Sequence, residues 1–229
     1  MLKIEKTVTA SPEQWMIIIE GMRNPKNSWD KIDSSIEYIE NPVTGNRAAW
    51  QFHLGENDDK LMRSLRDGGS VHAKYRRMIP VWVTLTAPLF WWKEFDTYKV
   101  GTVRNSCSTM HKIHTKPFSI DGFSHEGIDD CVLTTAFENT VLIPLENLRQ
   151  QYNTTKDKKY WRAIIEMLPD SYMMKATLFL NYEVLANMYY WRENHKLTEW
   201  HTFCDWIRSL PYSYLITGDL DENAVICGA

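Results

Sequence analysis

The chain has 229 residues, of which 44% are hydrophobic and 24% are charged, and its formal net charge is −3. This composition is typical of a globular protein, and the acidic balance excludes the broad basic surface on which general nucleic-acid binding depends. The most apolar run, residues 78–92, is interrupted by Pro80 and Pro88 and ends at Lys93. It therefore predicts no membrane-spanning helix.

The cysteines indicate neither a metal site nor a disulfide framework. They are Cys107, Cys131, Cys204 and Cys227, and no two of them have the spacing of a zinc-binding pair. A cluster of other candidate ligands, His125, Glu126, Asp129 and Asp130, also lacks a diagnostic spacing. Since the N-terminus shows no secretory signal, we expect reduced thiols and a cytoplasmic protein.

Two helices are predicted in the first third of the chain. Ser11 followed by Pro12 is a typical helix start, and apolar residues recur at helical spacing as far as Met22. A second helix is predicted over residues 56–67, because Leu61, Met62 and Leu65 share one face and two glycines follow.

A strand and a helix are predicted next. The β-branched, aromatic and small residues from Val81 to Thr86 are typical of a buried strand. The Ala87-Pro88 turn then opens a helix over residues 88–99, which Gly101 ends. The aromatic residues of this helix, Trp91, Trp92 and Phe95, are interpreted as core.

The remainder of the chain is predicted to be mainly helical. Residues 143–169 form two helices broken near residues 153–157, residues 173–194 form one long helix, and residues 198–210 form the last. The long helix carries one stripe that holds Asn181, Leu185, Met188 and Arg192. Helices outnumber strands and no linker divides the chain, so the sequence predicts a single α+β domain over residues 1–229.

The stretch KVGTVRNSCSTMH, Lys99 to His111, is crowded with polar side chains. Its basic residues, with two that follow, would suit a nucleotide phosphate or a solvated loop: Lys99, Arg104, Lys112 and Lys116. Cys107 and His111 offer a rival chemistry, because a helical turn would bring thiol and imidazole together as in a cysteine hydrolase.

Two separated segments resemble the flavin-dependent thymidylate synthases. That family has a strand, an Ala-Pro turn and a helix that leads into the motif RHRxxSxNExSxRY, and residues 86–111 show the same start and spacing with one residue inserted near Arg104. In this register Asn105 matches the motif's asparagine, and Ser108 matches the serine that lies near the reacting uracil carbon. Residues 168–200 resemble the family's second pattern at Leu168, Pro169, Asn181, Leu185, Asn187 and Arg192, and at His195 and Glu199 after a one-residue deletion.

The resemblance implies a helix-rich α+β fold with a central antiparallel sheet, and a homotetramer whose active sites combine several subunits. It implies reductive methylation of dUMP, with methylenetetrahydrofolate as carbon donor, FAD as the hydride carrier and NADPH as reductant. It assigns catalysis to Ser108 and Arg192. It also implies flavin contacts by Lys99, Asn181, Asn187 and His195, and nucleotide contacts by Arg104, Asn105, Arg162 and Lys175.

Several positions depart from the family pattern. Thr97, Tyr98 and Lys99 replace the flavin-binding Arg-His-Arg, and Met110, Ile165 and Glu183 stand where the family has arginines. Methionine cannot bind phosphate as an arginine fork does. Arg192 has a structural alternative, a salt bridge to Glu183 or Glu199. Two functions therefore stay open: methylation of dUMP, or an altered homologue that binds a nucleotide or flavin or acts on another pyrimidine.

Overall fold

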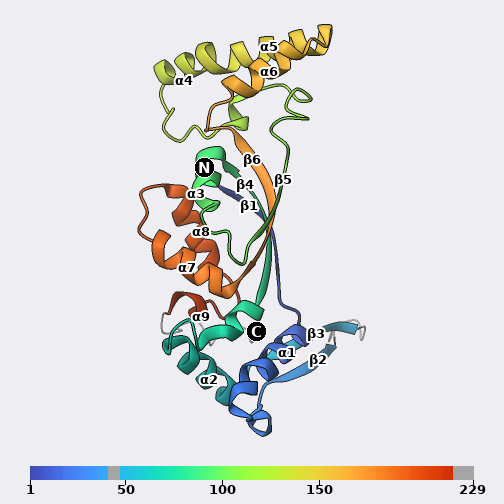
Figure 1. Cartoon of the computed structure of the whole chain (residues 1–229), viewed down its shortest axis with the longest axis vertical. Coiled ribbons are helices and arrows are strands. Elements are labelled where there is room, and N and C mark those ends of the chain that lie inside the picture. The colour runs from blue at the N-terminus through green and yellow to red at the C-terminus, as the bar shows by residue number, and fades with distance from the viewer. Residues whose placement is uncertain (41–46, 219–229) are drawn as a thin grey trace. The chain divides into compact units, whose positions relative to one another are not determined.

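The computed structural model describes residues 1–40 and 47–218 (Figure 1). These residues form a helix-rich α+β structure with a central antiparallel sheet, which confirms the predicted fold class. The chain divides into two compact units: unit 1 is Met1–Lys6, Thr84–Thr97 and Arg104–Leu178, and unit 2 is Thr7–Val83, Tyr98–Val103 and the chain from Phe179 onward. The single domain over residues 1–229 stays a prediction.

The central sheet has the strand order β1-β4-β6-β5. Its strands are β1 (Lys3–Thr9), β4 (Pro80–Pro88), β6 (Met173–Asn181) and β5 (Val103–Ser106). The predicted strand over Val81–Thr86 is the middle of β4. Its alternate residues Val81, Val83 and Leu85 are at most 1% exposed, as expected where one face of a strand packs on a core.

The prediction of one long helix over residues 173–194 is wrong. The first nine residues are β6, and the helix α7 covers only Tyr182–Arg192. Burial in β6 has the period of a strand, because Met174, Ala176, Leu178 and Leu180 are buried and the residues between them are more exposed. Methionine, alanine and leucine favour helices in isolation, and pairing in the sheet overrides that preference here.

Unit 1 holds the helices α3 (Leu89–Phe95), α4 (Cys131–Phe137), α5 (Ile143–Thr155) and α6 (Lys158–Met167). α5 and α6 pack against each other, as Figure 1 shows. The predicted break between them is confirmed: Lys156 ends α5 in the left-handed region, and the Asp157 carboxylate caps α6. The buried side chains of this region are Ile113, Phe123, Leu145 and Ile164.

The helix α3 is shorter than the sequence predicts. It ends at Phe95, where the hydroxyl and N–H of Thr97 both donate to the carbonyl oxygen of Glu94, at 2.8 and 3.1 Å. Trp91, Trp92 and Phe95 are at most 2% exposed, so their assignment to the core is confirmed.

Unit 2 holds α1 (Pro12–Arg23), β2 (Ser35–Glu40), β3 (Arg47–His53), α2 (Glu56–Asp67), the 3-10 helix η3 (Ala73–Met78), α7, α8 (Thr198–Arg208) and α9 (Tyr214–Thr217). The helices α1, α2 and α8 lie where the sequence predicts them. Ser11 and Gln14 form a capping box at the start of α1. The helix α1 packs against the antiparallel pair β2–β3, and α7 packs against α8, α9 and η3.

Within the described residues, no helix combines the length and apolarity needed to cross a membrane. Cys107, Cys131 and Cys204 are free thiols, of which Cys204 is buried, and burial raises the pKa of its thiol to about 11. Cys227 lies outside the described residues. In the part of the chain described, no three His, Cys, Asp or Glu side chains are grouped to hold a metal ion, and Asp130 instead caps α4.

Candidate functional site

A cavity of about 420 Å³ in unit 1, the Ser108 cavity, is lined by α3, by β5 and by the loop after β5. Arg104 and Ser106 lie on β5 and line it, as does Ser108 two residues further on. Alternate residues of a strand face the same side, which places Arg104 and Ser106 together, and the residues after the strand, Cys107 to Met110, continue the lining. Asn105 is out of phase with them, is exposed and is not among the lining residues.

Two cations, Arg104 and Lys93, line the Ser108 cavity, and Lys93 pairs with Asp170. Arg104 is held on two sides. Its guanidinium lies 5.0 Å from the centre of the Trp92 ring and pairs with Asp96, at 3.1 Å from Nη2 to the carboxylate. Its Nη1 is buried and has no hydrogen-bond partner among the described residues. Since an unmet buried donor is costly, this group is available to an acceptor on a ligand.

The Ser108 hydroxyl is held by the backbone that follows it. Its Oγ accepts hydrogen bonds from the N–H groups of Met110 and His111, at 3.2 and 2.9 Å. Because both interactions use oxygen lone pairs, the hydroxyl hydrogen is left to donate. The geometry therefore favours Ser108 as a hydrogen-bond donor to a ligand carbonyl rather than as a nucleophile.

The premise of the rival cysteine chemistry is wrong. Residues 107–111 form no helical turn, because Cys107 and Ser108 precede a turn at residues 109–111, so no helix brings the Cys107 thiol and the His111 imidazole together. The N–H of Cys107 instead donates to the carbonyl oxygen of Lys175 at 2.8 Å. Cys107 is a free, exposed thiol and is one of the residues that line the Ser108 cavity.

Two further predicted nucleotide contacts in unit 1 have other partners. Arg162 lies on α6 with its side chain 67% exposed and pairs with Glu166. Lys175 lies on β6 and pairs with Glu5, and this hydrogen bond lowers the pKa of the Glu5 carboxyl. Neither residue lines the Ser108 cavity, and their substrate roles stay predictions.

Arg192 lies in an aromatic setting in unit 2. Its Nε donates to the Tyr98 hydroxyl at 2.9 Å, and its guanidinium lies 4.8 Å from the Trp200 ring centre and 5.5 Å from that of Tyr98. His195 lies beside the same indole, with ring centres 6.3 Å apart. Two aromatic faces and one hydroxyl thus orient this arginine. Of the two carboxylates considered as alternative partners of Arg192, Glu183 pairs with Arg76, and the pairing with Glu199 stays a prediction.

Asn181 ends β6 and caps α7, with its Oδ1 accepting from the N–H of Val184 at 3.0 Å. Its Nδ2 faces Gly101, whose φ of +82° lies in the region that glycine adopts most readily, and a Cβ at Gly101 would lie 3.1 Å from that nitrogen. Lys99, in the turn before Gly101, is exposed. Both flavin assignments, to Asn181 and to Lys99, stay predictions.

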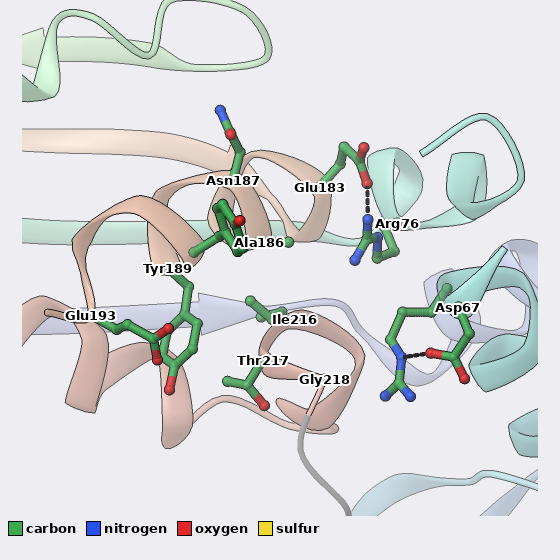
Figure 2. Close-up of a pocket in the computed structure, with 12 residues that line it drawn as sticks. Asp67, Arg76, Glu183, Ala186, Asn187, Tyr189, Glu193, Ile216, Thr217 and Gly218 are labelled. Carbon is green, nitrogen blue, oxygen red and sulfur yellow. Dashed lines mark hydrogen bonds and ion pairs between the residues drawn. The ribbon is translucent and has the colours of Figure 1, made fainter. Parts of the chain in front are cut away.

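A second cavity, the Arg76 cavity, lies in unit 2 and has a volume of about 410 Å³. Figure 2 shows that α7 supplies Glu183 and Asn187 to it, and that Arg76 reaches Glu183, with 2.6 Å between Nη2 and Oε2. The Nε of Arg76 is buried without a hydrogen-bond partner in the described part of the chain. In Figure 2 the Asn187 amide points away from Thr217 at the opposite wall.

The sequence analysis missed Arg76, and the Arg76-Arg77 pair directly before β4 was the only signal for it. It also missed Asp96, whose contact with Arg104 depends on the turn between α3 and β5. The predicted residues are thus brought together in part. Arg104 and Ser108 line one cavity, Arg192 and His195 both lie beside the indole of Trp200, and Asn187 lines a separate cavity.

No family model matches the sequence, and no curated protein is similar to it in sequence. Solved structures are similar in fold. The flavin-dependent thymidylate synthase ThyX of Helicobacter pylori, complexed with FAD and dUMP, aligns with a TM-score of 0.60 and 14% identity over 96% of this chain and 99% of that chain. Another structure of that enzyme with FAD and dUMP aligns with a TM-score of 0.64 and 14% identity over 95% and 97% of the two chains.

The UMP/dUMP methylase PolB of Streptomyces cacaoi, bound with 5-Br dUMP, aligns with a TM-score of 0.57 and 11% identity over 91% of this chain and 90% of that chain. The chain has the fold of the flavin-dependent thymidylate synthases. In this thymidylate synthase fold, two departures from the family motif have local counterparts. Tyr98, which the sequence resemblance aligns with the motif's histidine, contacts Arg192, and Glu183, which it aligns with an arginine, pairs with the guanidinium of Arg76.

Proposed function

We propose that this chain is a flavin-dependent enzyme that binds dUMP and methylates its uracil base reductively. The carbon donor is methylenetetrahydrofolate and the final reductant is NADPH. The observation that carries the proposal is the Ser108 cavity, whose lining residues include Arg104, with a buried Nη1 that has no hydrogen-bond partner among the described residues, and Ser108, whose hydroxyl hydrogen is left to donate. The fold supports the proposal, since similar chains were solved with FAD and dUMP.

The Ser108 cavity offers complementary groups for a pyrimidine nucleotide. The hydroxyl of Ser108 donates to a carbonyl oxygen of the base, and Nη1 of Arg104 donates to a phosphate or carbonyl oxygen. Arg104 cannot form a free fork, because its Nη2 is already paired with Asp96. We therefore expect weaker phosphate binding than two free arginines would provide.

The Arg76 cavity suits an anionic part of FAD. Its volume of about 410 Å³ is below that of a whole dinucleotide but within the range of small-molecule sites, and the unmet Nε of Arg76 is a charge-assisted donor for a diphosphate oxygen. Arg76 would hold the cofactor there, whereas the Asn187 amide points away from Thr217 and its flavin contact stays a prediction. The bound flavin would supply hydride transfer, whereas the protein's groups bind, orient and exclude water.

Arg192 is proposed to bind the base edge or the phosphate of the nucleotide. Tyr98 and Trp200 fix its guanidinium, so little side-chain freedom is lost when a ligand binds. His195 beside the same indole is proposed to contact the flavin. Preorganised positioning of this kind is the main contribution that a protein makes to a reaction whose chemistry a cofactor carries.

The remaining assignments are proposals that follow from the same fold. We propose a homotetramer, in which several subunits contribute to each site, and a cytoplasmic protein. A strict monomer in light scattering would contradict the composite site.

Tritium release from 5-tritiated dUMP tests the proposed reaction. We expect release by the wild-type protein with FAD, NADPH and methylenetetrahydrofolate, and loss of release in Ser108→Ala and Arg192→Ala. Ser64→Ala and Arg77→Ala are matched controls, because both side chains are exposed and line none of the cavities described above. Release that is indifferent to Ser108→Ala and Arg192→Ala would contradict the assignment.

A second candidate function is methylation of UMP, which the similarity to a UMP/dUMP methylase favours. The same assay with 5-tritiated UMP separates the two substrates. A protein that binds either nucleotide without releasing tritium is instead a binding homologue.

A further inference from the structure

A third cavity, the Arg23 cavity, lies in unit 2 and has a volume of about 570 Å³. It is formed by the end of α1, by the short 3-10 helices Asn24–Lys26 and Trp29–Lys31, and by the start of α2. Its charged lining residues are Arg23, Lys26 and Lys31 against a single carboxylate, Asp30. It shares no residue with the Ser108 or Arg76 cavities.

Arg23 is fixed in the wall of this cavity. It is 3% exposed, its Nε donates to Asp58 at 2.5 Å, and its Nη1 donates to the carbonyl oxygen and Oγ of Ser28 at 3.4 and 3.3 Å. Its Nη2 is buried and has no hydrogen-bond partner among the described residues. The guanidinium is therefore held in one orientation with one donor left over, which costs free energy until an acceptor meets it.

Asp58 orients Arg23 through its Nε but does not accept a hydrogen bond from its Nη2. Burial raises the pKa of the Asp58 carboxyl, but hydrogen bonds from Ser34 and Arg23 outweigh burial and hold the pKa below its ordinary value. The carboxylate is thus ionised at neutral pH, and its oxygens are occupied by Nε of Arg23 and by the N–H and hydroxyl of Ser34.

The two lysines supply positive charge that the described residues leave unpaired. Across residues 1–40 and 47–218, neither Lys26 nor Lys31 forms an ion pair, and both are exposed. Ser28 and Asn57 add a hydroxyl and an amide to the lining. The first N–H groups of α2 are not available, because Asp33 accepts from the N–H of Asn57 at 2.8 Å, so a ligand would be bound by side chains.

We propose that the Arg23 cavity binds a phosphate-class oxyanion. One ligand oxygen accepts from Nη2 of Arg23, and the ammonium groups of Lys26 and Lys31 pair with the others. Guanidinium and ammonium groups are the usual partners of phosphate, and tetrahedral oxygens accept from donors that converge from several directions. The cavity volume is large enough for inorganic phosphate, for pyrophosphate or for the phosphate of a nucleotide.

The proposal does not depend on the proposed methylation and is tested by calorimetric titration of the full chain with pyrophosphate and with AMP. The test variant is Lys26→Gln/Lys31→Gln, in which both exchanged side chains are exposed, so the fold is retained. The control is Lys6→Gln/Lys74→Gln, which removes the same charge from exposed positions outside the cavity.

We expect binding by the wild type that is weakened about tenfold in Lys26→Gln/Lys31→Gln and by less than about twofold in the control, because two charge-assisted contacts are lost only in the former. Tighter binding of AMP than of pyrophosphate would identify a nucleotide phosphate, and the reverse order would identify a free oxyanion. The absence of binding at millimolar ligand, or equal weakening in both variants, would overturn the proposal.

Discussion

Replacing Asp58 by asparagine tests whether the buried charge pair stabilises unit 2. Asp58 is fully buried and accepts from Nε of Arg23 at 2.5 Å, from Oγ and N–H of Ser34 at 2.7 and 2.9 Å, and from the N–H of Asp33 at 3.1 Å. Asparagine has nearly the same shape, but its NH₂ group would face one of these donors, and the buried guanidinium would lose its counter-charge.

The expected loss is large for a single substitution. Removing one partner of a buried ion pair costs about 3–5 kcal/mol, because the other charge stays buried and unpaired. We therefore expect Asp58→Asn to lower the free energy of unfolding by about 3–5 kcal/mol, measured by urea denaturation followed by circular dichroism. With m-values of about 2–3 kcal/mol per molar urea, the midpoint should fall by about 1–2.5 M.

Asp205→Asn is the matched control for this prediction. Asp205 also pairs with an arginine, Arg208, at 2.7 Å, but its side chain is 72% exposed, so the loss should stay below about 1 kcal/mol. A cycle with Arg23→Met should show a coupling of about 1–3 kcal/mol between Arg23 and Asp58. If Asp58→Asn costs no more than the control, the reasoning from burial and charge is refuted.

Two further predictions concern the other parts of the chain. Hydrogen bonds from Arg149 lower the pKa of Glu146 from 4.5 to about 2, so its contribution to stability is complete above pH 4.5 and is lost as the pH falls toward about 2. The melting-temperature deficit of Glu146→Gln relative to wild type should therefore shrink over that interval, and a deficit independent of pH would contradict this. Gly101→Ala should cost about 1–3 kcal/mol in thermal unfolding, since φ is +82° and the Cβ would approach Asn181. Gly127→Ala, where a Cβ meets nothing within 4 Å, should be close to neutral, and equal losses of stability in the two variants would contradict the argument.

The helix and strand starts were predictable where local chemistry decides them. Ser11 and Pro12 mark the start of α1 in the sequence, and the left-handed break at Lys156 lies within the polar segment where a break is predicted. The strand β6 was not predictable in the same way, because its Met, Ala and Leu residues suit a helix and only the neighbouring strands impose a period of two.

The candidate site was predictable from the sequence in part. Alternation along β5 explains why Arg104 and Ser106 line one cavity and why Asn105, one residue out of phase, does not, whereas Ser108 reaches the cavity through the loop after the strand. The pairing of Arg76 with Glu183 could not be predicted, because they lie 107 positions apart in the chain and neither position has a local pattern that indicates the other.

The junction between β6 and α7 has no loop: Asn181 is both the last residue of the strand and the cap of the helix. The register of the strand therefore sets the rotation of the helix. Each residue added or removed in β6 would reverse the two faces of the strand beyond that point and would turn the start of α7 toward the opposite face of the sheet. The direction of the Arg192 side chain is thus inherited from hydrogen bonding in the sheet, so insertions and deletions here should be far less tolerated than in the polar connection between α5 and α6.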